Sequence, residues 1–233
     1  VPYEEAITQD PANRLQGPSG EHWFGTDELG RDVFARVVHG SRYSLWIGVS
    51  TSIFSLIIGG LLGAVAGYYG KTIDNVIMRL TDVVMTVPPI LLSLAVVAAL
   101  GANLTNLLIG ITVSCIPNMV RMVRSTVLTV IDNDYIEAAK SYGSSDMRVI
   151  LRYVIPNALG PIIVTTTMNV AAMILSASGL SFLGMGVQPP SPEWGALLSD
   201  ARQYMFNAPY LLYFPGLFIV IAALSFNLAG DGL

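Results

Sequence analysis

The strongest constraint on the fold is the absence of charge over four long stretches of the chain. No Asp, Glu, Lys or Arg occurs in Tyr43–Gly70, Val83–Val120, Tyr153–Pro192 or Gln203–Gly230. A helix needs about 20 predominantly apolar residues to cross a bilayer, and each stretch is longer than that. Only 12% of the 233 residues are charged, against roughly 25% in ordinary soluble domains. The sequence therefore predicts an all-α polytopic membrane protein.

The four stretches predict five membrane spans, because Val83–Val120 is too long for one span. Gly101–Asn106 is rich in turn-forming residues and divides it into two. Lys71–Asp82 is predicted to be a short amphipathic connection. The predicted spans are Tyr43–Tyr69, Thr86–Leu100, Leu104–Met122, Pro156–Leu180 and Tyr210–Ala229. Pro88, Pro89 and Pro117 interrupt the second and third spans, which is tolerated where neighbouring helices or a water-lined cavity satisfy the freed backbone groups.

Small residues recur along the first span and predict a packing face. Gly59, Gly63 and Gly67 follow one another at intervals of four residues. In lipid, helix association depends on close packing, and small residues at this spacing let two backbones approach. We expect this helix to lie inside the bundle.

The spans hold no ionisable side chain, which argues against a proton- or ion-coupled carrier. Such carriers place Asp, Glu, His or Arg within the membrane to partner the coupled charge. The polar exceptions are Asn118, Asn169 and Asn227. Each is either an interhelical hydrogen-bonding group or a substrate contact, and Asn118 and Asn169 are the candidate pathway residues. Any transport by this chain is therefore expected to take its energy from outside the spans.

No motif predicts catalysis, nucleotide binding or a metal site in this chain. Gly70-Lys71-Thr72 resembles the end of a phosphate-binding loop, but that pattern requires glycine where this sequence has Val65. Cys115 is the only cysteine, and the two histidines, His22 and His39, both lie in the N-terminal segment. These residues provide neither a multi-cysteine metal site nor a Ser/His/Asp arrangement.

A polar segment, Asp134–Pro156, separates two apolar regions; we call it the polar island. It is predicted to form two helices. Asp134 is a candidate N-cap with Glu137 three residues later, as in a capping box. Gly143 suits a C′ position with positive φ, and Ser144 or Ser145 is a candidate cap for a second helix that runs toward Pro156.

The loop Ser181–Pro209 is predicted to hold an amphipathic helix that starts with Ser191 as N-cap, Pro192 at N1 and Glu193 in the first turn. Lys and Arg counts favour the polar island on the cytoplasmic side by seven to five, a weak bias under the positive-inside rule.

The polar island also carries a specific resemblance. Glu137-Ala138-Ala139-x-x-x-Gly143, followed after nine residues by Tyr153-x-Ile155-Pro156, resembles the E-A-A loop of membrane subunits of binding-protein-dependent ABC importers. The usual ending is I-x-L-P, from which Tyr153 and Ile155 depart mildly.

Two further blocks are similar to the dipeptide/oligopeptide/nickel branch of this family. One is Gly25-Thr26-Asp27-x-x-Gly30-Arg31-Asp32-x-x-x-Arg36, with Gly40-x-Arg42-x-Ser44-Leu45. The other is Ser181-Phe182-Leu183-Gly184-x-Gly186-Val187 with Pro192-Glu193-Trp194-Gly195.

The resemblance implies a type I ABC importer transmembrane domain over residues 43–233. Residues 1–42 would form an extracytoplasmic loop, residues 132–156 the cytoplasmic coupling loop, and residues 181–209 an outer loop. It also implies a further span before Gly25 and a short charged tail after Asp231, so that six spans are expected in the full protein.

In function, the resemblance implies a non-catalytic permease subunit in the bacterial inner membrane. Its partners would be a homologous permease, two cytoplasmic ATPase subunits and an extracytoplasmic substrate-binding protein. The ATPase would be coupled through Asp134, Glu137, Ala138, Ala139, Gly143 and Pro156. ATP and Mg²⁺ would lie on the ATPase subunits, so no cofactor is expected on this chain, and no nucleic acid is expected as a partner. The substrates of this branch are di- and oligopeptides, nickel chelates, glutathione and other small solutes.

Two other classes stay open from the residues alone. A secondary carrier or channel that works without an ATPase is disfavoured by the charge-free spans. A structural membrane scaffold is disfavoured by the proline interruptions, because such breaks cost stability unless they line something.

Overall fold

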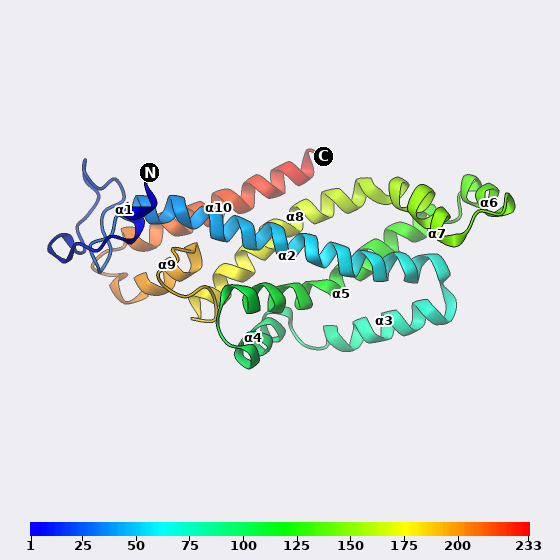
Figure 1. Ribbon diagram of the computed structural model, residues 1–233, viewed down its shortest axis with the longest axis horizontal. Helices are drawn as coiled ribbons and strands as arrows, with labels where there is room; N and C mark the ends of the chain where they lie inside the picture. Colours follow the sequence, from blue (N-terminus) through cyan, green and yellow to red (C-terminus); the bar gives the residue numbers. More distant parts are fainter.

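The computed structural model describes residues 1–233, which are helical almost throughout (Figure 1). No β-strand is present, and the only β-pairing is an isolated bridge between Thr26 and Asp32. The prediction of an all-α fold is confirmed. The helices are α1 (Tyr3–Ile7), η1 (Pro11–Asn13), α2 (Val33–Tyr69), α3 (Lys71–Met85), α4 (Pro89–Leu100), α5 (Leu104–Val130), α6 (Asp134–Ser141), α7 (Asp146–Val149), η2 (Ile150–Val154), α8 (Ile155–Phe182), α9 (Trp194–Ala201), η3 (Arg202–Tyr204) and α10 (Tyr210–Asp231).

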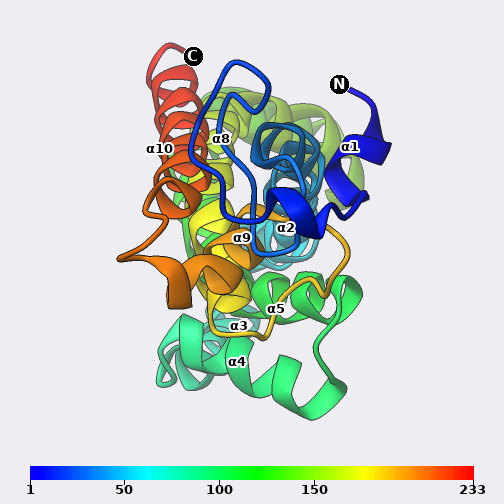
Figure 2. The same cartoon turned by 90° about the vertical axis from the view of Figure 1, so that its left-hand side faces the viewer.

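Four long helices, α2, α5, α8 and α10, run along the length of the molecule (Figure 1). The N-terminal segment and α9 lie at one end, and α6 and α7 lie at the other. Seen from the N-terminal end, α3 and α4 lie on one side of the bundle and α10 on the other (Figure 2). The 37 residues of α2 correspond to about 55 Å of helix, more than the roughly 30 Å of hydrocarbon in a bilayer, so this helix extends beyond the membrane.

The structure has four helices that are long and apolar enough to cross a membrane, and a fifth candidate span that is broken. The broken span consists of α3 and α4, which meet at an angle of 79°. The predicted span Thr86–Leu100 corresponds to α4, but the 12 residues of α4 give only about 18 Å of helix. Five spans are therefore reached only if α3 and α4 together count as one. The break lies at Pro88-Pro89, where each proline disfavours helical backbone at the residue before it.

The predicted connection Lys71–Asp82 is part of helix α3, and ion pairs join this helix to α5. The predicted end of the third span at Met122 is also wrong, since α5 continues to Val130. Arg124 donates to Asp74 (Nη2 to Oδ2, 2.5 Å), and Arg121 donates to Asp82. These two arginines therefore lie within a continuous helix and hold α3 along its side.

The glycine face of α2 lies against α5. A Cβ atom on Gly59 would stand 2.7 Å from the Met119 Cβ, and one on Gly63 would stand 2.5 Å from the carbonyl oxygen of Val120. A Cβ on Gly67 would stand 2.8 Å from the Val127 Cγ1. Only hydrogen fits at these positions, so α2 and α5 approach each other with almost no side chain between them.

We predict that Gly63→Ala destabilises the folded chain by about 1–3 kcal/mol, the usual cost of overpacking. The reason is that the new methyl group would meet backbone oxygen, which cannot move aside. The matched control is Gly60→Ala, where the nearest atom to the new Cβ is the Leu56 Cδ1 at 3.5 Å. Unfolding of the purified chain by SDS in mixed micelles measures both variants, and equal midpoints for the two would contradict this packing.

Candidate functional site

The polar island forms two helices joined by a tight turn, at the end of the molecule opposite the N-terminal segment (Figure 1). Gly143 has φ = 76°, which confirms the predicted left-handed position. The Gly143 N–H donates to the Lys140 carbonyl (2.9 Å), and the Ser144 N–H donates to the Ala139 carbonyl (3.1 Å). This pair of bonds is a Schellman motif, which ends α6 and turns the chain into α7.

The predicted capping box at the start of α6 is wrong. The N-cap is Asn133, which makes no side-chain cap bond, and its amide instead donates to the Val130 carbonyl (2.8 Å). With the cap at Asn133 the N3 position is Ile136, which has no group to return a bond. The carboxylates of Asp134 and Glu137 are consequently exposed and make no hydrogen bond within the chain.

Helix α6 has one buried and one exposed face. Ile136 and Ala139 belong to a hydrophobic cluster that includes Val127 and Val130 of α5. Glu137 and Ala138 lie on the exposed face. Of the two alanines of the E-A-A segment, Ala138 is therefore accessible to a partner protein, while Ala139 packs within the chain.

The second helix of the island is continuous with the span that follows it. Helical backbone runs from Asp146 to Phe182 through the π-helical turn Ile150–Val154. Pro156 lies in the first turn of α8, directly after the π-helical turn. Since a π turn accommodates local disruption of the helical hydrogen bonds, the chain passes the proline without ending the helix. A displacement of α7 would thus be carried along a single helix into the bundle.

Large apolar side chains are uncovered on the polar island. Tyr142 is 91% exposed and Met147 is 65% exposed. Tyr135 and Leu151 are exposed as well. Several exposed large apolar side chains on one short polar segment make it a candidate for a protein–protein contact.

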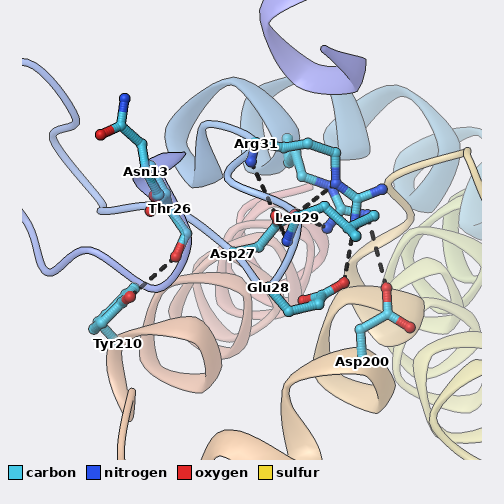
Figure 3. Close-up of polar contacts among 9 residues, drawn as sticks. Asn13, Thr26, Asp27, Glu28, Leu29, Arg31, Asp200 and Tyr210 are labelled. Carbon is cyan, nitrogen blue, oxygen red and sulfur yellow. Dashed lines mark hydrogen bonds and ion pairs between the residues drawn. The ribbon is translucent and has the colours of Figure 1, made fainter. Parts of the chain in front are cut away.

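A cluster of charged residues, buried at its centre, lies at the opposite end of the molecule; we call it the outer ion cluster (Figure 3). The Asp27 carboxylate accepts from Arg31 Nε (2.7 Å) and from Arg36 Nη1 (2.5 Å). The same carboxylate accepts from two backbone N–H groups, those of Leu29 (2.9 Å) and Arg31 (3.0 Å). All three charged side chains are at most 6% exposed, so Asp27 compensates two buried guanidinium groups.

Two further carboxylates border the outer ion cluster. Glu28 accepts from Arg31 Nη2 (3.1 Å), and Asp200 of α9 lies 3.7 Å from Arg36 Nη2. Burial raises the pKa of Glu28, and the nearby Asp27 charge raises it further. Burial also raises the pKa of Asp200, an effect that Arg36 opposes. The peripheral carboxyl groups, Glu28 and Asp200, therefore hold a proton more readily in the outer ion cluster than they would in water.

The outer ion cluster and its surroundings join the N-terminal segment to three helices. Arg36 lies on α2 and Asp200 on α9, and the Tyr210 hydroxyl of α10 donates to the Thr26 carbonyl (3.0 Å). Close by, Trp194 Nε1 donates to the Val37 carbonyl of α2 (2.9 Å).

The cap of α9 differs from the prediction. The helix begins at Trp194, and the fully buried Glu193 is its N-cap, accepting from the N–H groups of Gly195 (3.0 Å) and Ala196 (2.9 Å). Ser191 does not cap the helix. Glu193 also accepts from the Ser44 hydroxyl of α2 (3.1 Å), and this contact with a distant helix selects Glu193 as the cap.

Apart from the ion pairs between α3 and α5, the polar contacts between spans come from serines. Ser93 of α4 donates to Ser114 of α5 (2.8 Å), and Ser52 of α2 donates to the Thr166 carbonyl of α8 (3.0 Å). Asn118, Asn169 and Asn227 make no side-chain hydrogen bond to another helix, so their interpretation as interhelical bonding groups is wrong. Asn118 instead lines a small cavity beside the break between α3 and α4, together with Ser114 and Pro117.

The outer ion cluster was the feature that sequence reasoning missed. Asp27, Arg31 and Arg36 stood out as a spaced motif, but a polar loop before a span gave no reason to expect buried charge. One signal in the sequence is the spacing of Val33 and Arg36. They lie three residues apart at the start of a helix whose later residues are apolar, so they share a face of that helix, and the apolar Val33 indicates that this face is packed.

Comparison with known proteins identifies the family. Residues 59–233 match the family described as "Binding-protein-dependent transport system inner membrane component". The dipeptide transport system permease protein DppC of Alkalihalophilus pseudofirmus is 48% identical over 96% of this chain and 74% of its own length. The glutathione transport system permease protein GsiD of Pectobacterium atrosepticum is 42% identical over 100% of this chain and 77% of its own length.

Solved structures show the same fold. An inward-facing MetNI methionine ABC transporter matches with a TM-score of 0.69 and 20% identity, over 84% of this chain and 93% of the compared chain. An amino acid ABC transporter with histidines matches with a TM-score of 0.61 and 15% identity, over 85% of this chain and 91% of the compared chain.

The resemblance seen in the E-A-A segment is thereby confirmed. The chain belongs to the family of inner membrane components of binding-protein-dependent transport systems, as an ABC importer permease of the dipeptide/oligopeptide/nickel branch.

Proposed function

We propose that this multi-pass membrane protein is the permease subunit of an ATP-driven importer of small peptides. The observation that carries the proposal is the 48% identity to a dipeptide permease over 96% of the chain. Glutathione is the second candidate, since a glutathione permease is 46% identical over 100% of the chain. Dipeptides and glutathione are both short amide-linked molecules with free amino and carboxylate groups.

The proposed complex contains this chain, a homologous permease, two cytoplasmic ATPase subunits and an extracytoplasmic binding protein in a bacterial inner membrane. ATP and Mg²⁺ would be bound by the ATPase subunits, and this chain would bind no cofactor and catalyse no reaction. The family supports the general composition. The uncovered apolar surface around Tyr142 supports a protein partner at the polar island.

In this complex the exposed face of α6 would contact an ATPase subunit. Asp134 and Glu137 have no partner within the chain and are free to meet basic side chains. The turn at Gly143 sets the angle between α6 and α7, and Ala139 holds α6 on the core. Closure of the ATPases on ATP would displace α6 and α7, and the continuous helix through Pro156 would carry this displacement into the bundle as a rocking of the spans.

The opposite end of the molecule would receive substrate from the binding protein. The N-terminal segment and the loop before α10 lie there together, joined by the outer ion cluster (Figure 3). A surface assembled from two distant segments keeps its shape only while that joint holds. The proposed role of the outer ion cluster is to hold this docking surface.

Asn118 and Asn169 are proposed to contact the substrate. Neither amide makes a hydrogen bond to a neighbouring helix, so each retains donors and an acceptor for a peptide group. The cavity beside Asn118 lies at the break between α3 and α4, where non-helical backbone is expected to line a water-accessible space.

The second prediction concerns the polar island. In the complete complex reconstituted in liposomes, Glu137→Ala and Gly143→Val are expected to lower uptake of labelled di-alanine about tenfold or more, since the ATPase contact or the left-handed turn is lost. Asp132→Asn is the matched control, because Asp132 is exposed and outside α6. Binding-protein-stimulated ATP hydrolysis and uptake are measured together.

Unchanged hydrolysis and uptake in both island variants would overturn the coupling role. Competition by unlabelled glutathione decides between the two substrate candidates, and competition by a nickel chelate tests the remaining class. Uptake in ATP-free liposomes that hold this chain alone would instead support a carrier that works without an ATPase.

The third prediction concerns the outer ion cluster. Asp27→Asn removes the carboxylate that two buried guanidinium groups share, and leaves Arg31 with only Glu28 and Arg36 with only the more distant Asp200. It is expected to destabilise the chain by about 3–5 kcal/mol. Asp200→Asn is the matched control, expected to change stability by no more than about 0.5 kcal/mol, because its side chain is 35% exposed and its partner is distant. SDS unfolding in mixed micelles and binding-protein-stimulated hydrolysis measure both variants.

The contribution of Asp200 to the stability of the fold depends on pH with a definite sign. Since the pKa of Asp200 is raised in the folded state above its ordinary value of 3.8, its contribution to stability is present at lower pH and is lost as pH rises through the folded pKa. Asp200→Asn should remove this loss, so the variant gains stability relative to the wild type as pH rises. Equal effects of the two substitutions, or the opposite pH trend, would contradict the electrostatics described for the outer ion cluster.

A further inference from the structure

One side chain of α2 contacts both helices of the polar island. Tyr68, in the last turn of α2, is 9% exposed. Its hydroxyl donates to Asp146 Oδ1 at the start of α7 (2.7 Å). The Nζ of Lys140, near the end of α6, lies 5.0 Å from the centre of the Tyr68 ring. The first contact is a charge-assisted hydrogen bond and the second a cation–π contact.

The two island helices need an external link to move as one unit. The turn between them provides little packing of its own, since a Cβ on Gly143 would meet no atom within 4 Å. Apolar contacts through Ile136 and Val149 hold both helices on the same hydrophobic cluster. Among polar contacts, the two made by Tyr68 are the ones that join α6 and α7 to a common residue.

Tyr68 also lies where three helices of the bundle meet. Directly beyond it, Gly70 (φ = 61°) reverses the chain into α3. Asp74 in the first turn of α3 pairs with Arg124 of α5 (2.5 Å). The neighbouring Gly67 packs on Val127 of α5. A displacement of Tyr68 would therefore reach α2, α3 and α5 without passing through the continuous helix α7–α8.

We propose that Tyr68 is a positioning residue that transmits movement of the polar island to α2 and α3, in parallel with the covalent path into α8. The proposal rests on the proposed function, in which an ATPase subunit displaces α6. With the Tyr68 contacts present, α6 and α7 move together and take the end of α2 with them. Without them, α6 can turn about the Gly143 joint while α2 stays in place. ATP would then be hydrolysed without the matching movement of the spans.

An ordinary core role for Tyr68 predicts a different result. Burial of the ring contributes to stability whether or not the hydroxyl is present, so Tyr68→Phe retains nearly all of that contribution. A coupling role depends on the hydroxyl bond to Asp146. The ratio of substrate taken up to ATP hydrolysed separates the two roles, because a general loss of folded complex lowers both quantities together.

The test uses the complete complex in liposomes with labelled di-alanine, or glutathione if that is the better substrate. Tyr68→Phe is expected to lower uptake per ATP hydrolysed about fivefold, while the ATPase subunits stay bound. Tyr69→Phe is the matched control. The ring of Tyr69 lies next to that of Tyr68 but is exposed, and the Tyr69 hydroxyl makes no hydrogen bond. Asp146→Ala should reproduce the effect, and the double variant should be no worse than either single one, as for two residues that act through one contact.

An unchanged ratio in Tyr68→Phe, an equal fall in Tyr69→Phe, or additive effects of Tyr68→Phe and Asp146→Ala would each overturn the proposal. If the Tyr68→Phe complex does not assemble, Lys140→Met is used instead, because it removes the cation–π contact from the island surface. A fall in uptake per ATP hydrolysed supports the proposal, and an unchanged ratio overturns it. Failure of the proposed function is distinguishable: in that case Glu137→Ala and Gly143→Val also leave uptake and hydrolysis unchanged. If those two variants abolish coupling and Tyr68→Phe does not, only the role of Tyr68 is wrong.

Discussion

The close approach of α2 to α5 is the contact on which the rest of the structure depends. Gly59, Gly63 and Gly67 leave room for the backbone and Cβ atoms of α5, and no larger residue would fit. In lipid the hydrophobic effect does not drive helices together, so this close packing supplies attraction that the apolar surfaces alone would not. Both ends of α2 then organise polar structure. Arg36 enters the outer ion cluster at one end, and Tyr68 contacts the polar island at the other.

The distribution of charge agrees with the proposed energy input from a separate ATPase. Ion pairs lie in the outer ion cluster and in the α3–α5 pairs Asp74–Arg124 and Asp82–Arg121, and the polar island carries further charged residues. The remaining polar contacts between spans involve serine hydroxyls and backbone carbonyls. These groups do not titrate, so they provide no relay for coupling to protons. The family assignment and the exposed apolar surface of the polar island agree with energy input through a protein contact.

Local patterns in the sequence predicted the features that depend on local chemistry. Charge-free stretches indicated the long helices, and the glycine between two helical segments indicated the turn at Gly143. Predictions failed where a distant residue decides the outcome. Glu193 replaces Ser191 as the cap of α9 because Ser44 of α2 stabilises its buried carboxylate. The α3–α4 break was misread because the charged face of α3 resembles a connecting loop until Arg121 and Arg124 pair with it. In the outer ion cluster, the contact of Arg36 with Asp200 depends on the packing of α9 beside α2, which no local pattern contains.

The most direct test of the account is the position of the ATPase contact. Cys115 is the only cysteine and is buried, so Cys115→Ala gives a background in which single cysteines can be placed. Tyr142→Cys lies on the polar island, and Trp23→Cys is an exposed control at the opposite end. With a short bis-maleimide in native membranes, we expect cross-linking of Tyr142→Cys to the ATPase subunit and none of Trp23→Cys. Cross-linking of Trp23→Cys to the ATPase, with none of Tyr142→Cys, would contradict both the orientation and the coupling role of the polar island.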